Sequence, residues 1–343
     1  MRIVSVDAIP YALPFGAPYV TARGRLNRRE MVLLRLRTDD GVEGLGEAVP
    51  LALRGGGPSL ADTKRDLEDS RGEVVEDLSP PARAAVEMAR LDLEGKLQGL
   101  PAWRLLGAES AVAVPCNATL VAGPPSAVGA EAERWAERGF STFKLKVGVP
   151  GDVGQVEAVR AALGPEVRIR VDANGAWSPE EAILRLTAME RHGIELAEQP
   201  AADLEDLALV RDQTAIPIAA DESVASPADA ERAVELGACQ LATAKLAKVG
   251  GIEPLRAIAA AMPTYLSSAL DGPLGIAAAA HAAQVLPRDG PASALAHGLA
   301  TQLLFSETIA SRECALREDL LRLPDGPGLG VEIDEAALER HRL

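Results

Sequence analysis

Charged residues recur at a regular spacing along the second half of the chain, each near the end of a short apolar stretch. They are Lys144 and Lys146, then Asp172, Glu198, Asp221 and Lys245. From Lys146 onward, successive members are separated by about 25 residues, the length of one strand and one helix. Because Lys, Asp and Glu are rarely buried without partners, we expect these side chains to face one another in one site.

The three acidic members indicate a metal. Asp172, Glu198 and Asp221 supply carboxylate oxygens, and no Cys or His accompanies them in the motifs. Three carboxylates held together repel one another unless a cation lies between them, and oxygen ligands favour hard cations. The sequence therefore predicts a Mg²⁺ site, with Mn²⁺ as the alternative metal.

The lysines indicate proton transfer. Lys144 and Lys146 are two residues apart, so their side chains leave one face of a strand ~6.6 Å apart. Like charges this close lower each other's pKa, and we expect Lys146 to serve as a general base. Lys245 would approach from the opposite side. The predicted chemistry is removal of a proton α to a metal-bound carboxylate, with an enediolate stabilised by the metal and a second cation.

The elements that must position these residues form a repeating pattern after residue 111. Strand-like stretches alternate with Ala-rich, amphipathic helical ones. The expected strands span 112–120, 142–148, 167–173, 195–199, 216–221, 239–246, 264–270 and 293–299. This alternation predicts an α/β fold of the (β/α)8 type, in which the active site lies at the carboxyl ends of the strands.

The first part of the chain has a mixed pattern. We expect strands at 3–13, 30–38 and 42–48, with Asp39-Asp40-Gly41 as a hairpin turn, and helices at 59–78 and 80–98. The last segment offers no further barrel strand and is expected to pack back onto the N-terminal part. The predicted domains are therefore 1–111 together with 316–343, and 112–315.

Composition excludes several classes of function. The chain has 343 residues, 35 basic and 50 acidic, for a net charge of −15, which argues against binding to nucleic acid or to an anionic membrane. No apolar run is long enough to span a membrane. The three cysteines are far apart, which favours the cytoplasm as the location. A homo-oligomer is compatible with the sequence.

The motifs resemble those of the enolase superfamily, muconate lactonizing enzyme subgroup. Lys144-x-Lys146, Asp172-Ala-Asn, Glu198-Gln-Pro, Asp221-Glu-Ser and Lys245 followed by Gly250-Gly251 match its pattern in order and spacing, over essentially the whole chain. The resemblance implies a modified (β/α)7β barrel and an α+β capping domain completed by the C-terminal segment. It implies Mg²⁺ on the three carboxylates, a small carboxylate substrate, and catalysis by Lys146, Lys245 and Lys144.

Within the subgroup, three passages are similar to those of o-succinylbenzoate synthases. They span residues 19–30, 266–276 and 297–301. This similarity implies a hydro-lyase that dehydrates 2-succinyl-6-hydroxy-2,4-cyclohexadiene-1-carboxylate to 2-succinylbenzoate, a step of menaquinone biosynthesis. An N-succinylamino acid racemase, or another racemase, epimerase or cycloisomerase of the subgroup, would use the same lysines and remains the alternative.

Several further residues are candidate substrate contacts. Arg170 and Asn174 share the face of Asp172, although Arg170 could equally be an ion-pair partner that supports the site. Ser268 and Gly298 would lie near a succinyl group. The resemblance also implies a lid, formed by the loop at 15–25 with Arg23 and by the segment 48–57 with Arg54.

Overall fold

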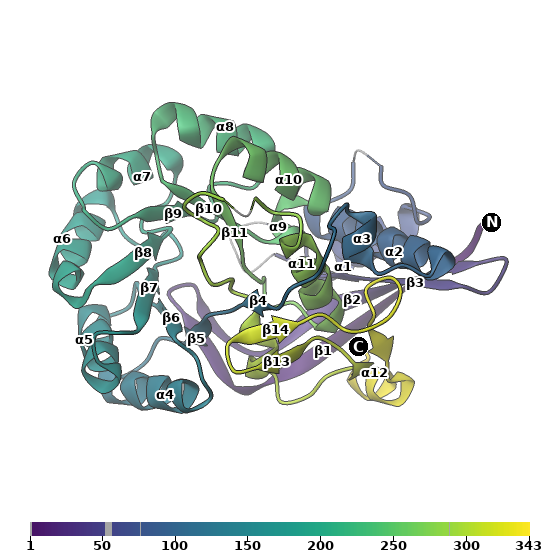
Figure 1. The fold of residues 1–343 in the computed structure, drawn as a ribbon, viewed down its shortest axis with the longest axis horizontal. Coiled ribbons are helices and arrows are strands. Elements are labelled where there is room, and N and C mark those ends of the chain that lie inside the picture. Colours follow the sequence, from purple (N-terminus) through teal and green to yellow (C-terminus); the bar gives the residue numbers. More distant parts are fainter. Residues whose placement is uncertain (1, 52–56, 76, 288) are drawn as a thin grey trace.

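The computed structural model describes residues 2–51, 57–75, 77–287 and 289–343. Figure 1 shows a ring of strands enclosed by helices, with an antiparallel sheet and further helices at one side. This arrangement confirms the predicted α/β fold with a separate N-terminal strand domain. Arg54 falls in the segment 52–56 and lies outside the described residues.

Seven parallel strands form the curled sheet of the barrel, in the spatial order β11-β10-β9-β8-β7-β6-β5. They are β5 (Ala118–Leu120), β6 (Thr142–Lys146), β7 (Arg168–Asp172), β8 (Ile194–Glu198), β9 (Ile218–Ala220), β10 (Leu241–Ala244) and β11 (Thr264–Leu266). The register pairs Lys146 with Asp172 and Asp172 with Glu198. Charged side chains of neighbouring strands are therefore held at the same height.

The barrel closes through a short irregular segment. The expected strand at 293–299 is wrong, because only two isolated bridges form there, His297 with Cys116 and Gly298 with Ser267. The backbone of His297 donates to Pro115 O at 2.7 Å, and that of Gly298 donates to Leu266 O at 2.8 Å. The turns before residue 295 prevent a longer ladder, but these bonds still join the two edges of the sheet.

Helices cover the outside of the barrel. They are α4 (Pro125–Glu137), α5 (Asp152–Leu163), α6 (Pro179–Met189), α7 (Leu204–Arg211), α8 (Pro227–Leu236), α9 (Leu246–Val249), α10 (Ile252–Ala261) and α11 (Pro273–Ala283), with 3-10 turns at Glu190–His192 and Ala300–Leu304. Ser178 and Ser226 cap α6 and α8 by accepting backbone N–H groups in the first turn, which satisfies donors that a helix leaves unpaired. The main apolar core lies between the sheet and these helices.

The N-terminal domain is built on a long antiparallel hairpin. It contains β1 (Ile3–Thr21), β2 (Gly24–Thr38), β3 (Glu43–Ala48), α1 (Leu60–Asp69), α2 (Pro80–Gln98) and α3 (Ala102–Leu105). The expectation of a loop at 15–25 is wrong, because β1 and β2 continue through this segment. Tyr19 pairs with Leu26 after a register shift between Pro14 and Tyr19. The expected helix at 59–78 ends at Asp69, because Arg71 and Gly72 take left-handed backbone conformations.

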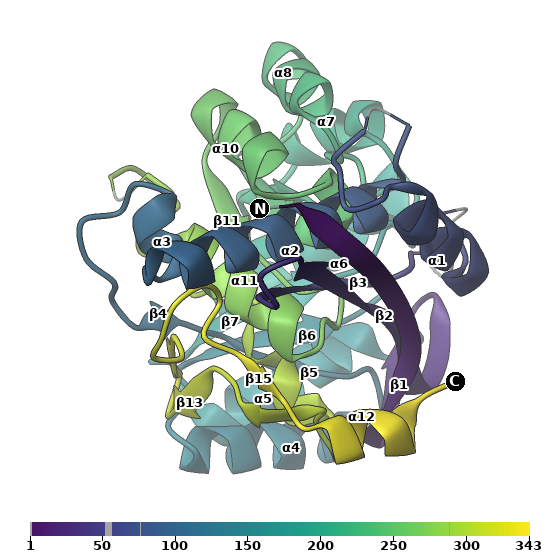
Figure 2. The same cartoon turned by 90° about the vertical axis from the view of Figure 1, so that its right-hand side faces the viewer.

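The C-terminal residues contact both parts of the molecule. Two short strands, β13 (Ala315–Arg317) and β14 (Leu320–Arg322), extend from β4 (Val114–Pro115) at the start of the barrel. The pair β12 (Ala310–Arg312) and β15 (Glu332–Ile333) follows, and α12 (Glu335–His341) then lies beside β1 (Figure 2). Asp92 of α2 accepts N–H groups from Leu45 and Leu329, both at 2.8 Å. The first and last parts of the chain are thus joined directly.

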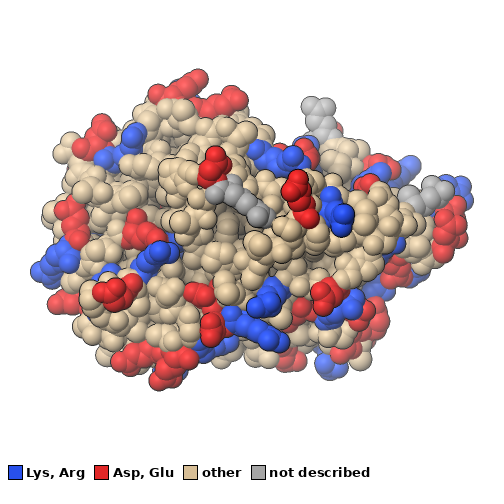
Figure 3. Space-filling model, viewed as in Figure 1, with Lys and Arg blue, Asp and Glu red and all other residues tan. Residues whose placement is uncertain are grey.

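The surface shows no single dominant charged region on the face in Figure 3, where acidic and basic side chains are interspersed. Among the described residues, the helices are too short or too polar to cross a bilayer.

Candidate active site

The predicted charged residues converge in the barrel lumen. Lys146, Asp172 and Glu198 end β6, β7 and β8, Asp221 follows β9, and Lys245 follows β10. All are at most 4% exposed. Side chains alternate along a strand, so the same face carries Lys144 and Arg170 one layer deeper. The structure therefore brings the six residues of the repeating pattern together.

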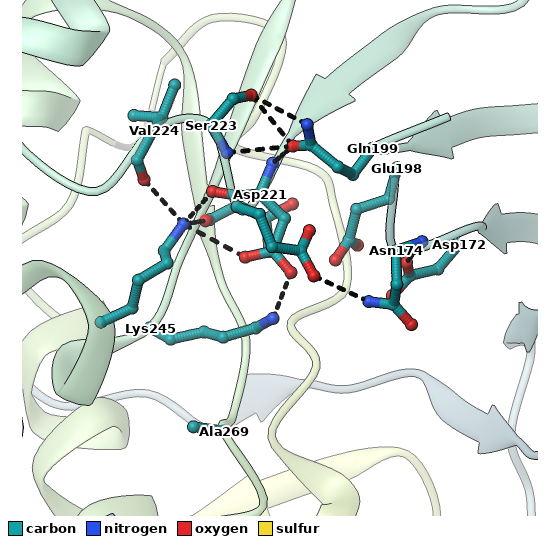
Figure 4. A network of polar contacts seen from close by, with 12 residues as sticks. Asp172, Asn174, Glu198, Gln199, Asp221, Ser223, Val224, Lys245 and Ala269 are labelled. Carbon is teal, nitrogen blue, oxygen red and sulfur yellow. Dashed lines mark hydrogen bonds and ion pairs between the residues drawn. The ribbon is translucent and has the colours of Figure 1, made fainter. Parts of the chain in front are cut away.

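The three carboxylates fit a divalent cation. One oxygen each from Asp172, Glu198 and Asp221 lies within 4.8 Å of the others, and Figure 4 shows the side chains reaching inward from neighbouring strands. Within the part of the chain that the structure describes, Glu198 Oε1 is buried and accepts no hydrogen bond. A buried carboxylate oxygen without a donor is costly, and an oxygen-only donor set suits Mg²⁺.

Lys144 and Lys146 reach the cluster from one side. Lys146 Nζ lies 2.5 Å from Asp172 Oδ2, while Lys144 Nζ lies 2.9 Å from the same oxygen and 2.6 Å from Glu198 Oε2. Burial lowers the pKa of Lys146, but the Asp172 carboxylate offsets this and leaves the pKa above its usual value. The lowering of the pKa expected from Lys144 is therefore outweighed here by Asp172, whose negative charge a bound cation would in turn offset.

Lys245 reaches the cluster from the other side. Its Nζ pairs with Asp221 Oδ2. Lys248 approaches the other oxygen of Asp221 at 3.1 Å and donates to Val224 O at 2.7 Å and Thr243 O at 2.9 Å. Figure 4 shows these contacts around Asp221. Lys248 thus holds the loop after β9, whereas Lys245 lies nearer the centre of the site.

A small pocket of about 90 Å³ lies beside Lys146, under the tip of the β1–β2 hairpin. Its apolar lining includes Tyr19, Leu26 and Leu270. Its charged lining, besides Lys146, consists of Arg23, Arg25, Arg29 and Glu222. Glu222 is paired: Arg23 Nη2 lies 3.5 Å from its Oε1, and Asn174 Nδ2 donates to it at 3.0 Å. The pocket therefore offers an excess of positive charge.

Two of the expected substrate contacts, Arg23 and Asn174, line this pocket. Asn174 has a left-handed φ of 51°, which turns the chain after β7 so that its side chain faces the site. Its Oδ1 accepts from Lys146 at 3.2 Å, and its backbone oxygen accepts from Arg23 Nε at 3.0 Å. Asn174 thus joins the hairpin tip to the lysine.

The other described candidates are placed differently. Arg170 is fully buried below the carboxylates and pairs with Glu195, which favours the ion-pair alternative over substrate contact. The Ser268 hydroxyl donates to Asp271 at 2.7 Å and is engaged in that turn. Gly298 lies in the closing segment, where a Cβ would approach Ser267 Oγ at 2.5 Å. These residues support the site from below or beside it.

Sequence reasoning missed Tyr265. This side chain is fully buried, and its hydroxyl donates to Glu198 Oε2 at 2.7 Å. The alternation in Thr-Tyr-Leu-Ser places Tyr265 and Ser267 on the lumen face. That alternation is the signal that would have indicated an aromatic residue inside the barrel.

Comparison with known protein families agrees with this geometry. The "Enolase C-terminal domain-like" family matches residues 127–337, and the "Mandelate racemase / muconate lactonizing enzyme, N-terminal domain" family matches residues 4–80. The chain belongs to the enolase superfamily, in its muconate lactonizing enzyme subgroup. The predicted superfamily is therefore confirmed.

Its relatives in the subgroup catalyse several reactions. The chain is 31% identical to L-Ala-D/L-Glu epimerase of Bacillus subtilis, over 96% of this chain and 97% of the relative. It is 27% identical to N-succinyl-L-Arg/Lys racemase of Bacillus cereus, over 99% and 97%.

Solved structures of the subgroup show the same fold. The muconate lactonizing enzyme from Pseudomonas fluorescens, complexed with muconolactone, superimposes with a TM-score of 0.92 at 30% identity, covering 100% of this chain and 99% of that one. The dipeptide epimerase from Enterococcus faecalis, complexed with Mg and L-Leu-L-Tyr, gives 0.89 at 28% identity, covering 97% and 100%.

Proposed function

We propose that the protein is an o-succinylbenzoate synthase, which dehydrates 2-succinyl-6-hydroxy-2,4-cyclohexadiene-1-carboxylate in menaquinone biosynthesis. One observation carries this proposal: the pocket beside Lys146 is lined by Arg23, Arg25 and Arg29. The substrate carries two carboxylates, one on the ring and one on the succinyl group. A cationic pocket next to three metal-binding carboxylates suits such a dianion.

The same pocket disfavours a dipeptide, which carries an ammonium group. An ammonium is best held by a carboxylate, and Oε1 of Glu222 is already bound by Arg23 and Asn174, whereas its Oε2 accepts no hydrogen bond from the described residues. Asp271 accepts from Ser268 and from the Ala269 N–H, each at 2.7 Å. Asp271 and one oxygen of Glu222 are therefore engaged within the protein, and the three arginines and Lys146 around the pocket outweigh the single negative charge of Glu222.

In the proposed mechanism, Asp172, Glu198 and Asp221 would hold Mg²⁺. The bound metal would supply a Lewis acid that stabilises the negative charge developing on the ring carboxylate. Lys146 would take the α proton at Nζ and return it to the departing hydroxyl group, so that water leaves from the same face. Lys245 would remain protonated and stabilise the developing charge from the opposite side.

Other residues would prepare the site. Lys144 bonds to both Asp172 and Glu198 and would fix their orientation. Tyr19, Leu26 and Leu270 line the pocket under the hairpin and would exclude water from the developing charge.

The second candidate is N-succinylamino acid racemisation. It is favoured by the two lysines, because Lys146 pairs with Asp172 on one side of the site and Lys245 pairs with Asp221 on the other. Racemisation needs a base on each face of the α carbon, and an N-succinylamino acid is also a dianion. The similarity to the Bacillus cereus racemase agrees with this candidate.

The deciding experiment compares both reactions with purified protein and Mg²⁺. Dehydration is followed by loss of the cyclohexadiene absorbance, and racemisation by exchange of the α proton of N-succinylamino acids in deuterated water. We expect dehydration to be faster, and Lys146→Met to lower its rate ~10²–10⁴-fold. Arg28→Met, on the exposed part of the hairpin, serves as the control.

Two results would contradict the proposal. If α-proton exchange is fast and dehydration is absent, the protein is a racemase. If L-Ala-L-Glu is epimerised faster than either dianion reacts, the argument from the cationic pocket is wrong.

A further inference from the structure

Beneath the metal-binding carboxylates lies a second polar layer of the barrel lumen. It contains Lys144, Arg170 and Tyr265, which are at most 3% exposed. Lys144 and Arg170 are register partners on β6 and β7, and Tyr265 comes from β11 on the far side of the sheet order. The proposed proton transfer does not use Arg170 or Tyr265.

Tyr265 controls which oxygen of Glu198 is available. Its hydroxyl donates to Oε2 at 2.7 Å, and Lys144 Nζ lies 2.6 Å from the same oxygen. Oε1 accepts no hydrogen bond from the described residues, although it is buried. The two donors therefore fix the rotation of the carboxylate and leave Oε1 as its free oxygen.

Arg170 in turn fixes Tyr265. Its guanidinium carbon lies 5.2 Å from the centroid of the Tyr265 ring, within the range of a cation–π contact. Its Nε donates to Glu195 Oε2 at 2.5 Å and its Nη1 to Ala296 O at 2.6 Å. Arg170 belongs to β7, and its guanidinium group is bonded to β8 and to the segment that closes the barrel. These bonds fix the guanidinium group, which in turn restricts the position of the Tyr265 ring.

We propose that Tyr265 and Arg170 are positioning residues, which orient Glu198 so that Oε1 is presented to the divalent cation. Groups that hydrogen bond to metal ligands fix their orientation and raise the affinity for the metal. The inference goes beyond the proposed function, because it concerns the metal centre and holds for any substrate of the subgroup.

The chain offers a matched control for the key variant. Tyr11 is also fully buried, and its hydroxyl also donates to a buried glutamate, Glu47 Oε2, at 2.7 Å. Glu47 lies outside the carboxylate triad. Tyr265→Phe and Tyr11→Phe therefore make the same chemical change in similar surroundings, and only the first is adjacent to a proposed metal ligand.

The test measures Mg²⁺ affinity by titration calorimetry on the full chain, without substrate. We expect Tyr265→Phe to weaken Mg²⁺ binding ~10–100-fold, and Tyr11→Phe to leave it within twofold of the wild type. Manganese EPR, which counts free Mn²⁺, should show the same order. With substrate, the Mg²⁺ concentration for half-maximal activity should rise in Tyr265→Phe, with most of kcat recovered at saturating Mg²⁺.

Arg170 gives an independent variant. Arg170→Met should weaken Mg²⁺ binding in the same direction, and Arg170→Lys, which keeps the charge over the ring, should restore part of it. Because both residues act through Glu198, the double variant Tyr265→Phe/Arg170→Met should lose less than the product of the two single effects. If Tyr265→Phe does not fold, Arg170→Lys and Arg170→Met decide the question in the same titration.

The outcomes separate this inference from the proposed function. If the wild type binds Mg²⁺ and Tyr265→Phe binds it within twofold, Tyr265 has no positioning role and the inference is wrong. Equal weakening by Tyr11→Phe and Tyr265→Phe would also overturn it, because the effect would then be one of stability alone. If the wild type itself binds neither Mg²⁺ nor Mn²⁺, the inference is wrong together with the metal centre, whereas a wild type that binds Mg²⁺ but does not dehydrate the proposed substrate overturns only the proposed function.

Discussion

Arg23 at the tip of the hairpin donates from Nε to the backbone oxygen of Asn174, 3.0 Å away and 151 residues later in the chain. Asn174 also accepts from Lys146 through its side-chain oxygen. The N-terminal domain is thus two hydrogen bonds from the proposed base. This contact explains how a residue outside the barrel can influence chemistry at the strand ends.

Loss of the hydrogen bond from Arg23 to Asn174 should lower the catalytic efficiency more than it lowers the free energy of unfolding. We predict that Arg23→Met lowers kcat/KM ~10-fold or more, because a hydrogen bond from a charged donor contributes ~1.5–3 kcal/mol. Most of the effect should be in KM, since the hairpin tip covers the pocket. Steady-state kinetics on the dianionic substrate checks this, with Arg28→Met as the control. An equal effect of both variants would show that the hairpin responds only to charge.

Divalent cations should stabilise the folded protein. Asp172, Glu198 and Asp221 are buried within 4.8 Å of one another, so a cation that binds them favours the native state. At a Mg²⁺ concentration 100 times the Kd, we expect a gain of ~2.7 kcal/mol in the free energy of unfolding. Thermal melts with Mg²⁺ and with EDTA measure it. Asp221→Asn should abolish most of the difference, and a wild type that melts identically in both conditions would contradict the prediction.

His281 should make stability depend on pH. Its Nδ1 accepts the Trp103 N–H at 3.0 Å, and its Nε2 lies 3.2 Å from Leu329 O. Burial lowers the pKa of His281 to about 4. Between pH 4 and the ordinary pKa of histidine, the unfolded chain therefore binds more protons than the folded protein. The contribution of neutral His281 to the free energy of unfolding is complete above pH 6.5 and is lost as the pH falls through 4.

The change at His281 amounts to about 2 kcal/mol between pH 8 and pH 5. Urea unfolding at the two pH values measures it, with His281→Gln for comparison. The variant should lose less stability than the wild type on acidification. Burial also lowers the pKa of His297 to about 4. Both proteins contain His297, so its effect on the pH dependence cancels in the comparison. A wild type and variant with the same pH dependence would refute the role of His281.

A side chain at Gly251 should destabilise the protein. Its φ is +121°, and a Cβ would lie 1.6 Å from Glu87 Oε2. Glu87 accepts the Ile252 N–H at 2.7 Å and the Glu253 N–H at 3.2 Å, which caps α10 from the N-terminal domain. Gly251→Ala should therefore cost about 2–4 kcal/mol of unfolding free energy, from backbone strain and loss of the cap.

The control for Gly251 is Gly99→Ala. Gly99 also has a positive φ, +67°, but nothing lies within 4 Å of the added Cβ, so only about 1 kcal/mol should be lost. Urea unfolding of both variants gives the comparison. A loss at Gly251 no greater than that at Gly99 would show that Glu87 moves away at little cost.

Much of the fold could be predicted because the barrel repeats. Alternation along each strand and the recurrence of Lys146, Asp172 and Glu198 place charges in one lumen, and parallel pairing then brings them together. The hairpin was harder. Tyr19 pairs with Leu26 only beyond a register shift, and a shift of this kind has no clear signature in the residues themselves.

The remaining differences arise from contacts between distant residues. The closing segment has two bridges rather than a strand because turns precede residue 295, and its bonds at His297 and Gly298 are made with the two edges of the sheet. The partners of Arg170 at Glu195 and Ala296, and the bond from Tyr265 to Glu198, are likewise set by strand order. Local sequence patterns indicate which side chains face the lumen, but not which of them pair.

The position of Asp92 has a consequence for how the protein is made. Its two carboxylate oxygens accept from Leu45, 47 residues earlier, and from Leu329, 237 residues later. A ribosome therefore releases the whole barrel sequence before the second of these bonds can form. The N-terminal domain therefore lacks this bond during translation, and a ribosome stalled before residue 329 should leave the domain more sensitive to protease than it is in the finished chain.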